Sequence, residues 1–170
     1  MKRKVFPLTR SEIIDHLTDI YARKNSDYGN SAHYTFVEFG EVALVIRISD
    51  KLSRLESLMS GREQQVGDES VLDTLGDAVT YLHMLVAEID TAVDDLPEAL
   101  SKARQDNIAR VYELFKETKQ HDLAKPGIAL QPFRSHLLSI WRTESIKLRR
   151  DLYLGLAHYL LREYAHMSAA

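Results

Sequence analysis

The sequence predicts an all-α protein, and three observations carry that prediction. Apolar side chains recur at intervals of about three to four residues along most of the chain, as on the buried face of a helix. Few β-branched runs alternate with a period of two, as half-buried strands would. Glycine and proline number only 7 and 4 in 170 residues, so strong turn signals are few. We expect a four-helix core bundle with one or two additional C-terminal helices.

The first predicted helix begins at Thr9 or Ser11 and ends near Lys24. If Thr9 is the N-cap, Glu12 stands three residues later, which is the spacing of a capping box. The stretch 25–31, Asn-Ser-Asp-Tyr-Gly-Asn-Ser, consists of residues that favour turns, so we place a loop there.

The second predicted helix begins near Tyr34 or Thr35 and continues to about Ser60. Its stretch 42–48 is apolar except for Arg47, which predicts a central position in the bundle. After a polar loop, a third helix is expected from 68–70 to about Asp90.

Asp94 and Asp95 then form an N-cap region, and Pro97 lies in the first turn of a fourth helix that ends near Lys119. Pro126, Gly127 and Pro132 mark an internal boundary. We therefore expect a helical core over 1–120 and a C-terminal helical extension over 121–170. The extension is one helix, or two with a break near Thr143, packed on the same domain or at an oligomer interface.

Composition argues against several classes of function. The formal charge is −3, so a general nucleic-acid-binding surface is not indicated. The absence of cysteine excludes disulfides and thiolate metal sites, and fits a reducing cytosol. No apolar run approaches the ~18 residues of a membrane span, and Val5-Phe6-Pro7-Leu8 is too short for a signal peptide. We expect a cytoplasmic protein, in the host cytoplasm if a phage encodes it, with no membrane partner.

Two pairs of acidic residues suggest a metal site. Glu38 and Glu41 are three residues apart, and Asp73 and Asp77 are four apart, so each pair shares one face of its predicted helix. If the two helices pack antiparallel, four carboxylates can converge, and such oxygen ligands suit Mg²⁺ or Mn²⁺. Acidic residues on helices are mostly solvated, so spacing alone does not establish the site.

Glycine supplies the context that strengthens this prediction. Gly40 and Gly76 each stand directly before an acidic residue within an apolar helical run. Glycine inside a helix costs about 1 kcal/mol relative to alanine. This cost suggests close packing, or room for a ligand beside the carboxylate.

Both acidic motifs resemble those of MazG-type, all-α nucleoside triphosphate pyrophosphatases. Residues 38–41, Glu-Phe-Gly-Glu, resemble the first motif of that family, a Glu-x-x-Glu that often has glycine before its second glutamate. Residues 73–77, Asp-Thr-Leu-Gly-Asp, resemble the second motif, Glu-x-x-Asp, with Asp77 at the final aspartate. The first glutamate of that motif falls on Thr74, which has no carboxylate, and Asp73 is placed to replace it.

Further segments extend the resemblance. Residues 103–110, Ala-Arg-Gln-Asp-Asn-Ile-Ala-Arg, resemble the His-Arg-x-Asn-Met-x-Lys segment of phage and bacterial MazG-like proteins. In those proteins the asparagine and the basic residue lie beside the phosphates, and here they fall on Asn107 and Arg110. Residues 24–30, 47–51 and 68–77 are also similar to the nucleotide-modification-associated family of small phage and bacterial proteins. The tail from about Gln120 resembles nothing that we can name.

The resemblance implies hydrolysis of a (deoxy)nucleoside triphosphate, for example a purine one such as dGTP, to the monophosphate and pyrophosphate. This reaction would serve nucleotide-pool control or DNA modification. Divalent ions, Mg²⁺ or Mn²⁺, would neutralise the phosphates and orient the attacking water, and Glu41 is our choice of general base. The expected metal ligands are Glu38, Glu41, Asp73, Asp77 and Glu69. The expected substrate-binding residues are Lys51, Arg54, Asn107, Arg110, Asp27 and Tyr28. The family commonly assembles into dimers or tetramers, so a homo-oligomer is implied.

Simpler interpretations stay open for the same residues. Lys51 and Arg54 would form surface ion pairs of little energetic value, Tyr28 would pack on the first helix, and Arg110 would belong to a basic helix surface. The alternative function is a non-catalytic helical module that senses a nucleotide or binds a partner protein. A less favoured alternative is nucleic-acid binding by the basic tail. Its cations are Arg142, Lys147, Arg149, Arg150 and Arg162.

Overall fold

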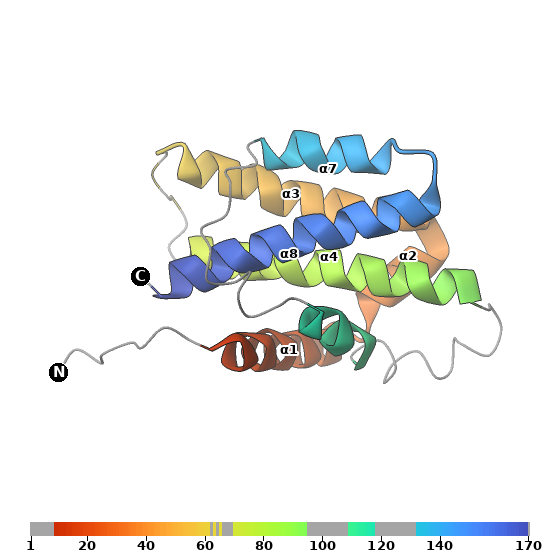
Figure 1. Ribbon diagram of the computed structural model, residues 1–170, viewed down its shortest axis with the longest axis horizontal. Coiled ribbons are helices and arrows are strands. Elements are labelled where there is room, and N and C mark those ends of the chain that lie inside the picture. Colours follow the sequence, from red (N-terminus) through yellow and green to blue (C-terminus); the bar gives the residue numbers. More distant parts are fainter. Residues whose placement is uncertain are drawn as a thin grey trace.

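The computed structural model describes residues 9–61, 63, 65, 70–94, 109–117 and 132–169. Over these residues the protein is all-helical and contains no strand, which confirms the predicted class. Residues 109–116 are also helical. The helices with defined bounds are α1 (Arg10–Asp27), α2 (Ser31–Phe39), α3 (Glu41–Met59), α4 (Val71–Asp94), α7 (Phe133–Trp141) and α8 (Ile146–Ala169) (Figure 1).

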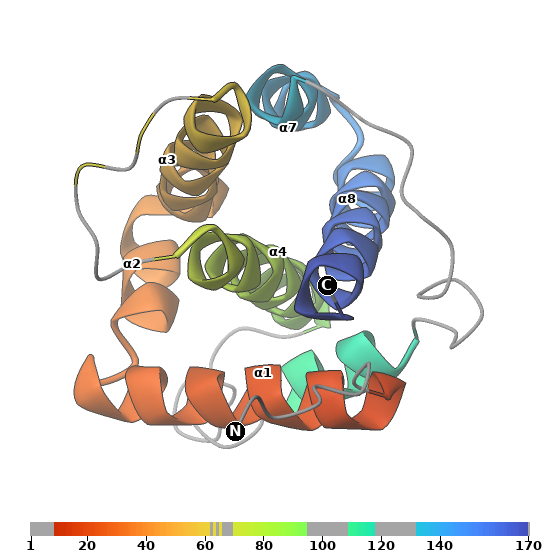
Figure 2. The same ribbon diagram turned by 90° about the vertical axis from the view of Figure 1, so that its left-hand side faces the viewer.

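Helix α4 lies at the centre of the protein, with α3, α8 and α1 around it (Figure 2). Apolar side chains on more than one of its faces are buried, as a helix packed on several sides requires. Fully buried examples are Ala78, Val79, Leu82, Leu85 and Val86. Helix α7 packs against α3 and α8. Helix α1 lies across α4 on the opposite side from α7, and the candidate site lies along this side (Figure 2).

The predicted start of the first helix is confirmed. Thr9 is the N-cap of α1, and its hydroxyl accepts a hydrogen bond from the Glu12 N–H at 3.3 Å. The Thr9 N–H donates in return to the Glu12 carboxylate at 2.7 Å, which completes the capping box. The helix ends at Asp27, one turn beyond the predicted end near Lys24, and the backbone N–H of Tyr28 caps it by donating to the Lys24 carbonyl.

The prediction of one continuous helix from about Tyr34 to Ser60 is wrong, because the chain breaks at Gly40. This glycine has φ 77°, a left-handed value that an α-helix cannot contain and that side-chain-bearing residues rarely adopt. Its N–H donates to the Phe36 carbonyl at 2.7 Å and ends α2, and α3 begins at the next residue. The break separates Glu38, on α2, from Glu41, at the start of α3, so the two do not share a helix face.

The C-terminal segment forms two helices, with a break at 142–145 that includes the predicted position Thr143. Helix α8 packs along α4, and its side chains Tyr153, Leu160 and Leu161 are fully buried. Gly76 of α4 makes this close approach possible. A Cβ atom at position 76 would stand 3.1 Å from the Tyr164 ring and 3.3 Å from the Leu17 side chain. The predicted close packing at this glycine is therefore observed.

The predicted fourth helix lies mostly outside the described residues. Its helical part 109–116 contributes Val111 and Phe115 to the core. Most of the predicted boundary at 121–132 is also outside the described residues. None of the helices in the described part of the chain is long and apolar enough to cross a bilayer.

Candidate functional site

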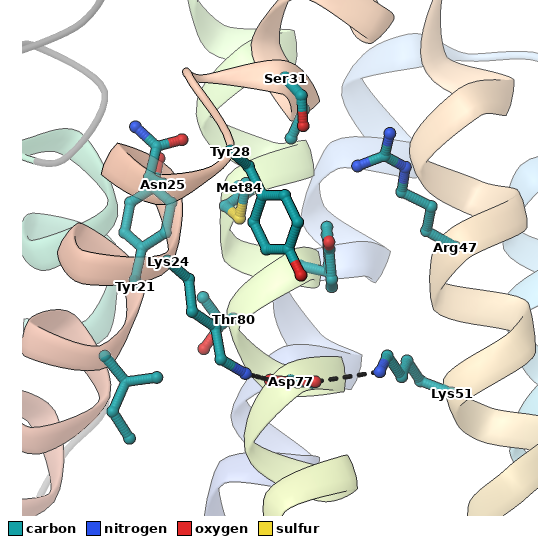
Figure 3. A pocket seen from close by; sticks show the side chains of 13 residues that line it. Tyr21, Lys24, Asn25, Tyr28, Ser31, Arg47, Lys51, Asp77, Thr80 and Met84 are labelled. Carbon is teal, nitrogen blue, oxygen red and sulfur yellow. Dashed lines mark hydrogen bonds and ion pairs between the residues drawn. The ribbon is translucent and has the colours of Figure 1, made fainter.

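A cavity of about 280 Å³ opens between α1, α3 and α4, beside the start of α2 (Figure 3). Its lining combines apolar, aromatic, cationic and amide side chains, a mixture that is typical of small-molecule sites. The lining residues are Ile20, Tyr21, Lys24, Asn25, Tyr28, Ser31, Ala32, Arg47, Lys51, Asp77, Thr80, Tyr81 and Met84.

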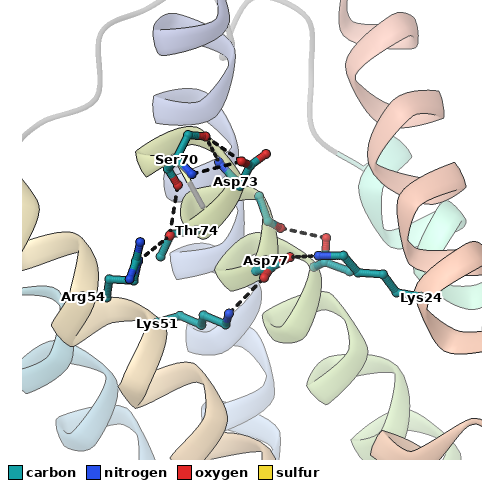
Figure 4. A network of polar contacts seen from close by, with 9 residues as sticks. Lys24, Lys51, Arg54, Ser70, Asp73, Thr74 and Asp77 are labelled. Carbon is teal, nitrogen blue, oxygen red and sulfur yellow. Dashed lines mark hydrogen bonds and ion pairs between the residues drawn. The ribbon is translucent and has the colours of Figure 1, made fainter. Parts of the chain in front are cut away.

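Asp77 lies between two lysines at one end of this pocket. Its Oδ1 is 2.8 Å from Lys24 Nζ, and its Oδ2 is 3.0 Å from Lys51 Nζ (Figures 3 and 4). Arg47 adds a third cation, and its guanidinium also donates to Thr35 Oγ1 at 3.3 Å. Three cationic side chains therefore face the same cavity, and Asp77 is the single carboxylate among its described lining residues. The net positive charge favours an anionic ligand.

The rest of the lining offers hydrogen bonds and stacking surfaces. Asn25 is only 7% exposed, and its side-chain amide forms no hydrogen bond with any other described residue. The residue lines the cavity, so this amide is available to a ligand. Tyr28 is 70% exposed beside the cavity. Burial and the nearby Glu88 raise the pKa of the Tyr21 hydroxyl, which keeps it a hydrogen-bond donor at neutral pH.

Asp73 caps the start of α4. Its Oδ2 accepts from the Ser70 N–H at 3.1 Å and from the Ser70 hydroxyl at 2.8 Å, and Ser70 Oγ accepts from the Asp73 N–H at 3.0 Å (Figure 4). These hydrogen bonds from Ser70 lower the pKa of the Asp73 carboxyl. The predicted metal ligand is thus an exposed capping residue in this structure.

Thr74 is fully buried between α3 and α4. Its hydroxyl accepts from Arg54 Nε at 3.1 Å and donates to the Ser70 carbonyl at 3.1 Å (Figure 4). Arg54, a predicted phosphate ligand, is therefore directed to this contact and does not line the pocket. A glutamate at position 74, as in the motif of the resembling family, would meet Arg54 instead of the cavity.

Glu41 belongs to a different cluster. Arg149 of α8 binds its carboxylate through two nitrogens, with Nε–Oε1 and Nη2–Oε2 distances of 3.0 Å, and the Tyr153 hydroxyl donates to Oε1 at 2.6 Å. Arg149 also donates through Nη1 to the carbonyls of Thr143 and Glu144. The Glu41 side chain is 15% exposed. Burial and the Glu41 carboxylate raise the pKa of Tyr153.

The structure thus brings together only part of the predicted site. Asp77, Lys51 and Tyr28 line one pocket, and Asp73 lines an adjoining cavity. Five predicted site residues do not line the pocket: the exposed Glu38, Asp27 and Arg110, and also Glu41 and Arg54. The Arg110 side chain donates a hydrogen bond to Thr91 at 3.0 Å. Glu69 and Asn107 lie outside the described residues.

The predicted metal ligands that the structure describes do not form one cluster. Across residues 9–61, 70–94, 109–117 and 132–169, no three or more Asp, Glu or His side chains are arranged to hold one ion. Both Asp77 oxygens face ammonium groups, and both Glu41 oxygens face a guanidinium.

Three pocket residues, Lys24, Asn25 and Arg47, were not among the predicted site residues. Isolated basic and amide residues on helices carry no functional pattern, so spacing could not select them. All three nevertheless lie in 24–30 and 47–51, the segments that resemble the nucleotide-modification-associated family. That resemblance was the signal that could have found them.

Comparison with known proteins adds nothing to these observations. No protein-family model, no curated protein and no solved structure matches this chain. The MazG-type resemblance therefore stays a prediction from the motifs.

Proposed function

We propose that the protein is a nucleoside triphosphate pyrophosphohydrolase whose substrate binds in the pocket between α1, α3 and α4. The observation that carries this proposal is the convergence of Lys24, Lys51 and Arg47 on one cavity, whose described lining contains a single carboxylate, Asp77. Three cations around one cavity suit a ligand with a polyphosphate. The reaction itself is taken from the resemblance of the two acidic motifs.

Asp77 explains how the pocket stays ordered before the ligand arrives. Its carboxylate holds Lys24 and Lys51 apart and pointed at the cavity. Lysine stems are flexible, so both ammonium groups can turn from Asp77 to phosphate oxygens. The Asp77 carboxylate would then lie beside the phosphates with its oxygens no longer bound by lysine. It could take the proton of an attacking water. We accordingly assign the general base to Asp77 instead of Glu41, whose carboxylate is bound by Arg149 and Tyr153.

We also propose the other features that the resemblance implies, namely a MazG-like four-helix core, a cytoplasmic homo-oligomer and dependence on Mg²⁺ or Mn²⁺. The described donor set supplies no metal-binding group, so metal dependence is a part of the proposal that the assay measures separately.

A second candidate function is nucleotide sensing without turnover. The pairing of both Asp77 oxygens with lysines favours it, because such a site binds phosphates without needing a reactive group. A sensor would bind nucleoside triphosphates and leave them intact.

A panel of nucleoside triphosphates with Mn²⁺, followed by chromatography of the products, tests the proposal. We expect the monophosphate and pyrophosphate in equal amounts, with turnover lost when the ion is omitted. Lys51→Met retains the aliphatic stem and removes the charge, so the affinity for the triphosphate should fall about tenfold or more.

Lys116→Met is the matched control, because Lys116 pairs with Glu113 three residues away and does not line the pocket. Equal losses in the two variants would show that the pocket is not the binding site. A diphosphate and orthophosphate product would contradict the proposed reaction. Binding with no product at any ion concentration would favour the sensor.

A further inference from the structure

A second cavity of about 320 Å³ adjoins the first. Ile20, Lys24, Asp77 and Thr80 line both cavities, so these residues form the partition between them. The other walls of the second cavity come from Leu17 of α1, from Leu72, Asp73 and Gly76 of α4, and from Tyr164 of α8. The two cavities therefore form consecutive compartments of one groove, with the Lys24–Asp77 ion pair between them.

The two compartments differ in charge. Counted over the part of the chain that the structure describes, three cations and one carboxylate line the first, and two carboxylates, Asp73 and Asp77, and one cation, Lys24, line the second. An anionic group is favoured in the first compartment, and a neutral group that donates hydrogen bonds is favoured in the second.

The walls of the second compartment suit a planar, largely apolar group. Leu17, Ile20 and Leu72 supply apolar surface, and the Tyr164 ring lies against Gly76. Tyr164 is only 5% exposed, and its hydroxyl forms no hydrogen bond with any residue that the structure describes. Burial raises the pKa of this hydroxyl, so it keeps its proton. Tyr164 lines the cavity and its hydroxyl oxygen is not sealed off from it, so a ligand there can complete its hydrogen bonds.

Asp73 can accept a hydrogen bond from such a ligand without losing its capping role. Ser70 donates its hydrogen bonds to Asp73 Oδ2, and Asp73 Oδ1 takes no part in the cap. A carboxylate accepts hydrogen bonds and donates none when ionised, and the hydrogen bonds from Ser70 keep the pKa of this carboxyl low. It would therefore select a donor edge, such as an exocyclic amino group.

We propose that the second compartment binds the base of the nucleotide and selects a base that carries an exocyclic amino group, with Asp73 and the Tyr164 hydroxyl as its polar contacts. The phosphates would lie in the first compartment, and the sugar would cross the Lys24–Asp77 partition. This inference rests on the proposed function, because it assumes that the first compartment binds phosphates.

Titration calorimetry with dGMP, dIMP and pyrophosphate tests the inference without turnover. dGMP and dIMP differ only in the 2-amino group, so the wild-type protein should bind dGMP about tenfold more tightly, the value of one hydrogen bond to a charged group. Asp73→Asn replaces an acceptor oxygen by a donor amide and keeps an oxygen for Ser70. In this variant the dGMP preference should disappear while the affinity for pyrophosphate stays unchanged.

Two further variants make the test independent of the helix cap. Leu72→Trp adds volume to the wall of the second compartment and should weaken dGMP binding while sparing pyrophosphate. Asp19→Asn is the matched control, since Asp19 forms an exposed pair with Arg23 on α1 and lines neither cavity. It should retain the wild-type preference.

The outcomes separate the two proposals. Equal affinities for dGMP and dIMP in the wild-type protein, together with pyrophosphate binding that depends on Lys51, would overturn the base compartment and leave the proposed function standing. A dGMP preference that Asp73→Asn retains, or that Tyr28→Ala abolishes, would place the base elsewhere and would also overturn it. Absence of any binding would overturn both.

Discussion

Asp77 and Glu41 occupy corresponding places in the two acidic motifs, yet their surroundings differ. Asp77 faces a cavity and is held by two lysines on separate helices, and its side chain is 18% exposed. Glu41 is similarly sheltered, but one arginine binds both of its oxygens and a buried tyrosine donates to one of them. Burial alone does not distinguish the two carboxylates.

The kind of cation distinguishes them. Arginine presents a rigid fork that matches a carboxylate, and Arg149 is further fixed by the carbonyls of Thr143 and Glu144. Lysine is a point charge on a flexible stem, which can exchange one anion for another. The Glu41 cluster therefore has the features of a structural tie between α3 and α8, whereas the Asp77 cluster can rearrange around a ligand.

The largest effect that this comparison predicts is on stability. Glu41→Ala should lower the free energy of unfolding by about 3 kcal/mol, because it leaves Arg149 and the Tyr153 hydroxyl without their shared partner. Pyrophosphate affinity of the folded variant should not change. Urea unfolding and calorimetry measure the two quantities.

Glu38→Ala is the control, since Glu38 is exposed on α2 and its loss should cost less than about 0.5 kcal/mol. If Glu41→Ala is stable but inactive, Glu41 is the catalytic group that the motif predicted and the comparison fails.

A smaller but diagnostic effect is predicted at Asp77. Asp77→Asn should lower turnover about a hundredfold, because the variant cannot accept the proton of the attacking water. Its affinity for pyrophosphate should rise, since Lys24 and Lys51 no longer share their charge with a carboxylate. Asp50→Asn, an exposed neighbour of Lys51, serves as the control. A fall in pyrophosphate affinity in Asp77→Asn would mean that the carboxylate organises the pocket more than it competes with the ligand.

The smallest effect concerns a third carboxylate, Glu88, whose partner His33 can titrate. The buried His33 Nδ1 lies 2.9 Å from Glu88 Oε1, and this hydrogen bond raises the pKa of His33 above its ordinary value. The stability from the charged pair is complete below the ordinary histidine pKa and is lost as the pH rises through the raised pKa.

The stability difference between the wild-type protein and His33→Gln should thus be about 1 kcal/mol larger near pH 6 than near pH 9. Urea unfolding at both pH values measures it, with His136→Gln on α7 as control, because His136 pairs with no carboxylate among the described residues. A difference that grows with pH would show that His33 is neutral in the folded protein. No such dependence is expected for the arginine-bound Glu41.

Local sequence signals predicted the helices well. Apolar periodicity gave the all-α class, and the Thr9–Glu12 capping box fixed the start of α1. The break at Gly40 was missed because the same glycine can sit inside a helix at modest cost or end it at a left-handed φ. The backbone conformation of Gly40 depends on the tertiary structure and cannot be read from the local sequence.

The site was harder to predict because partners distant in sequence decide each residue's role. Spacing selected Asp77, which the structure places in the pocket, but it could not show that Lys24 and Lys51 bind this carboxylate. Spacing also selected Glu41, and nothing near it in the sequence indicates Arg149, which lies 108 residues away. Arg54 was selected as a cation, and its direction toward the buried Thr74 follows from the packing of α3 on α4.

The contact between Gly76 and Tyr164 has a consequence for how the protein folds. It joins α4 to α8, which are far apart in the sequence. The wall that Tyr164 contributes to the second compartment therefore forms only after a long loop of the chain has closed. Until α8 docks, the apolar face of α4 that it covers would be open to other chains. We expect refolding yield to depend on protein concentration, and the compartment to form late among the events of folding.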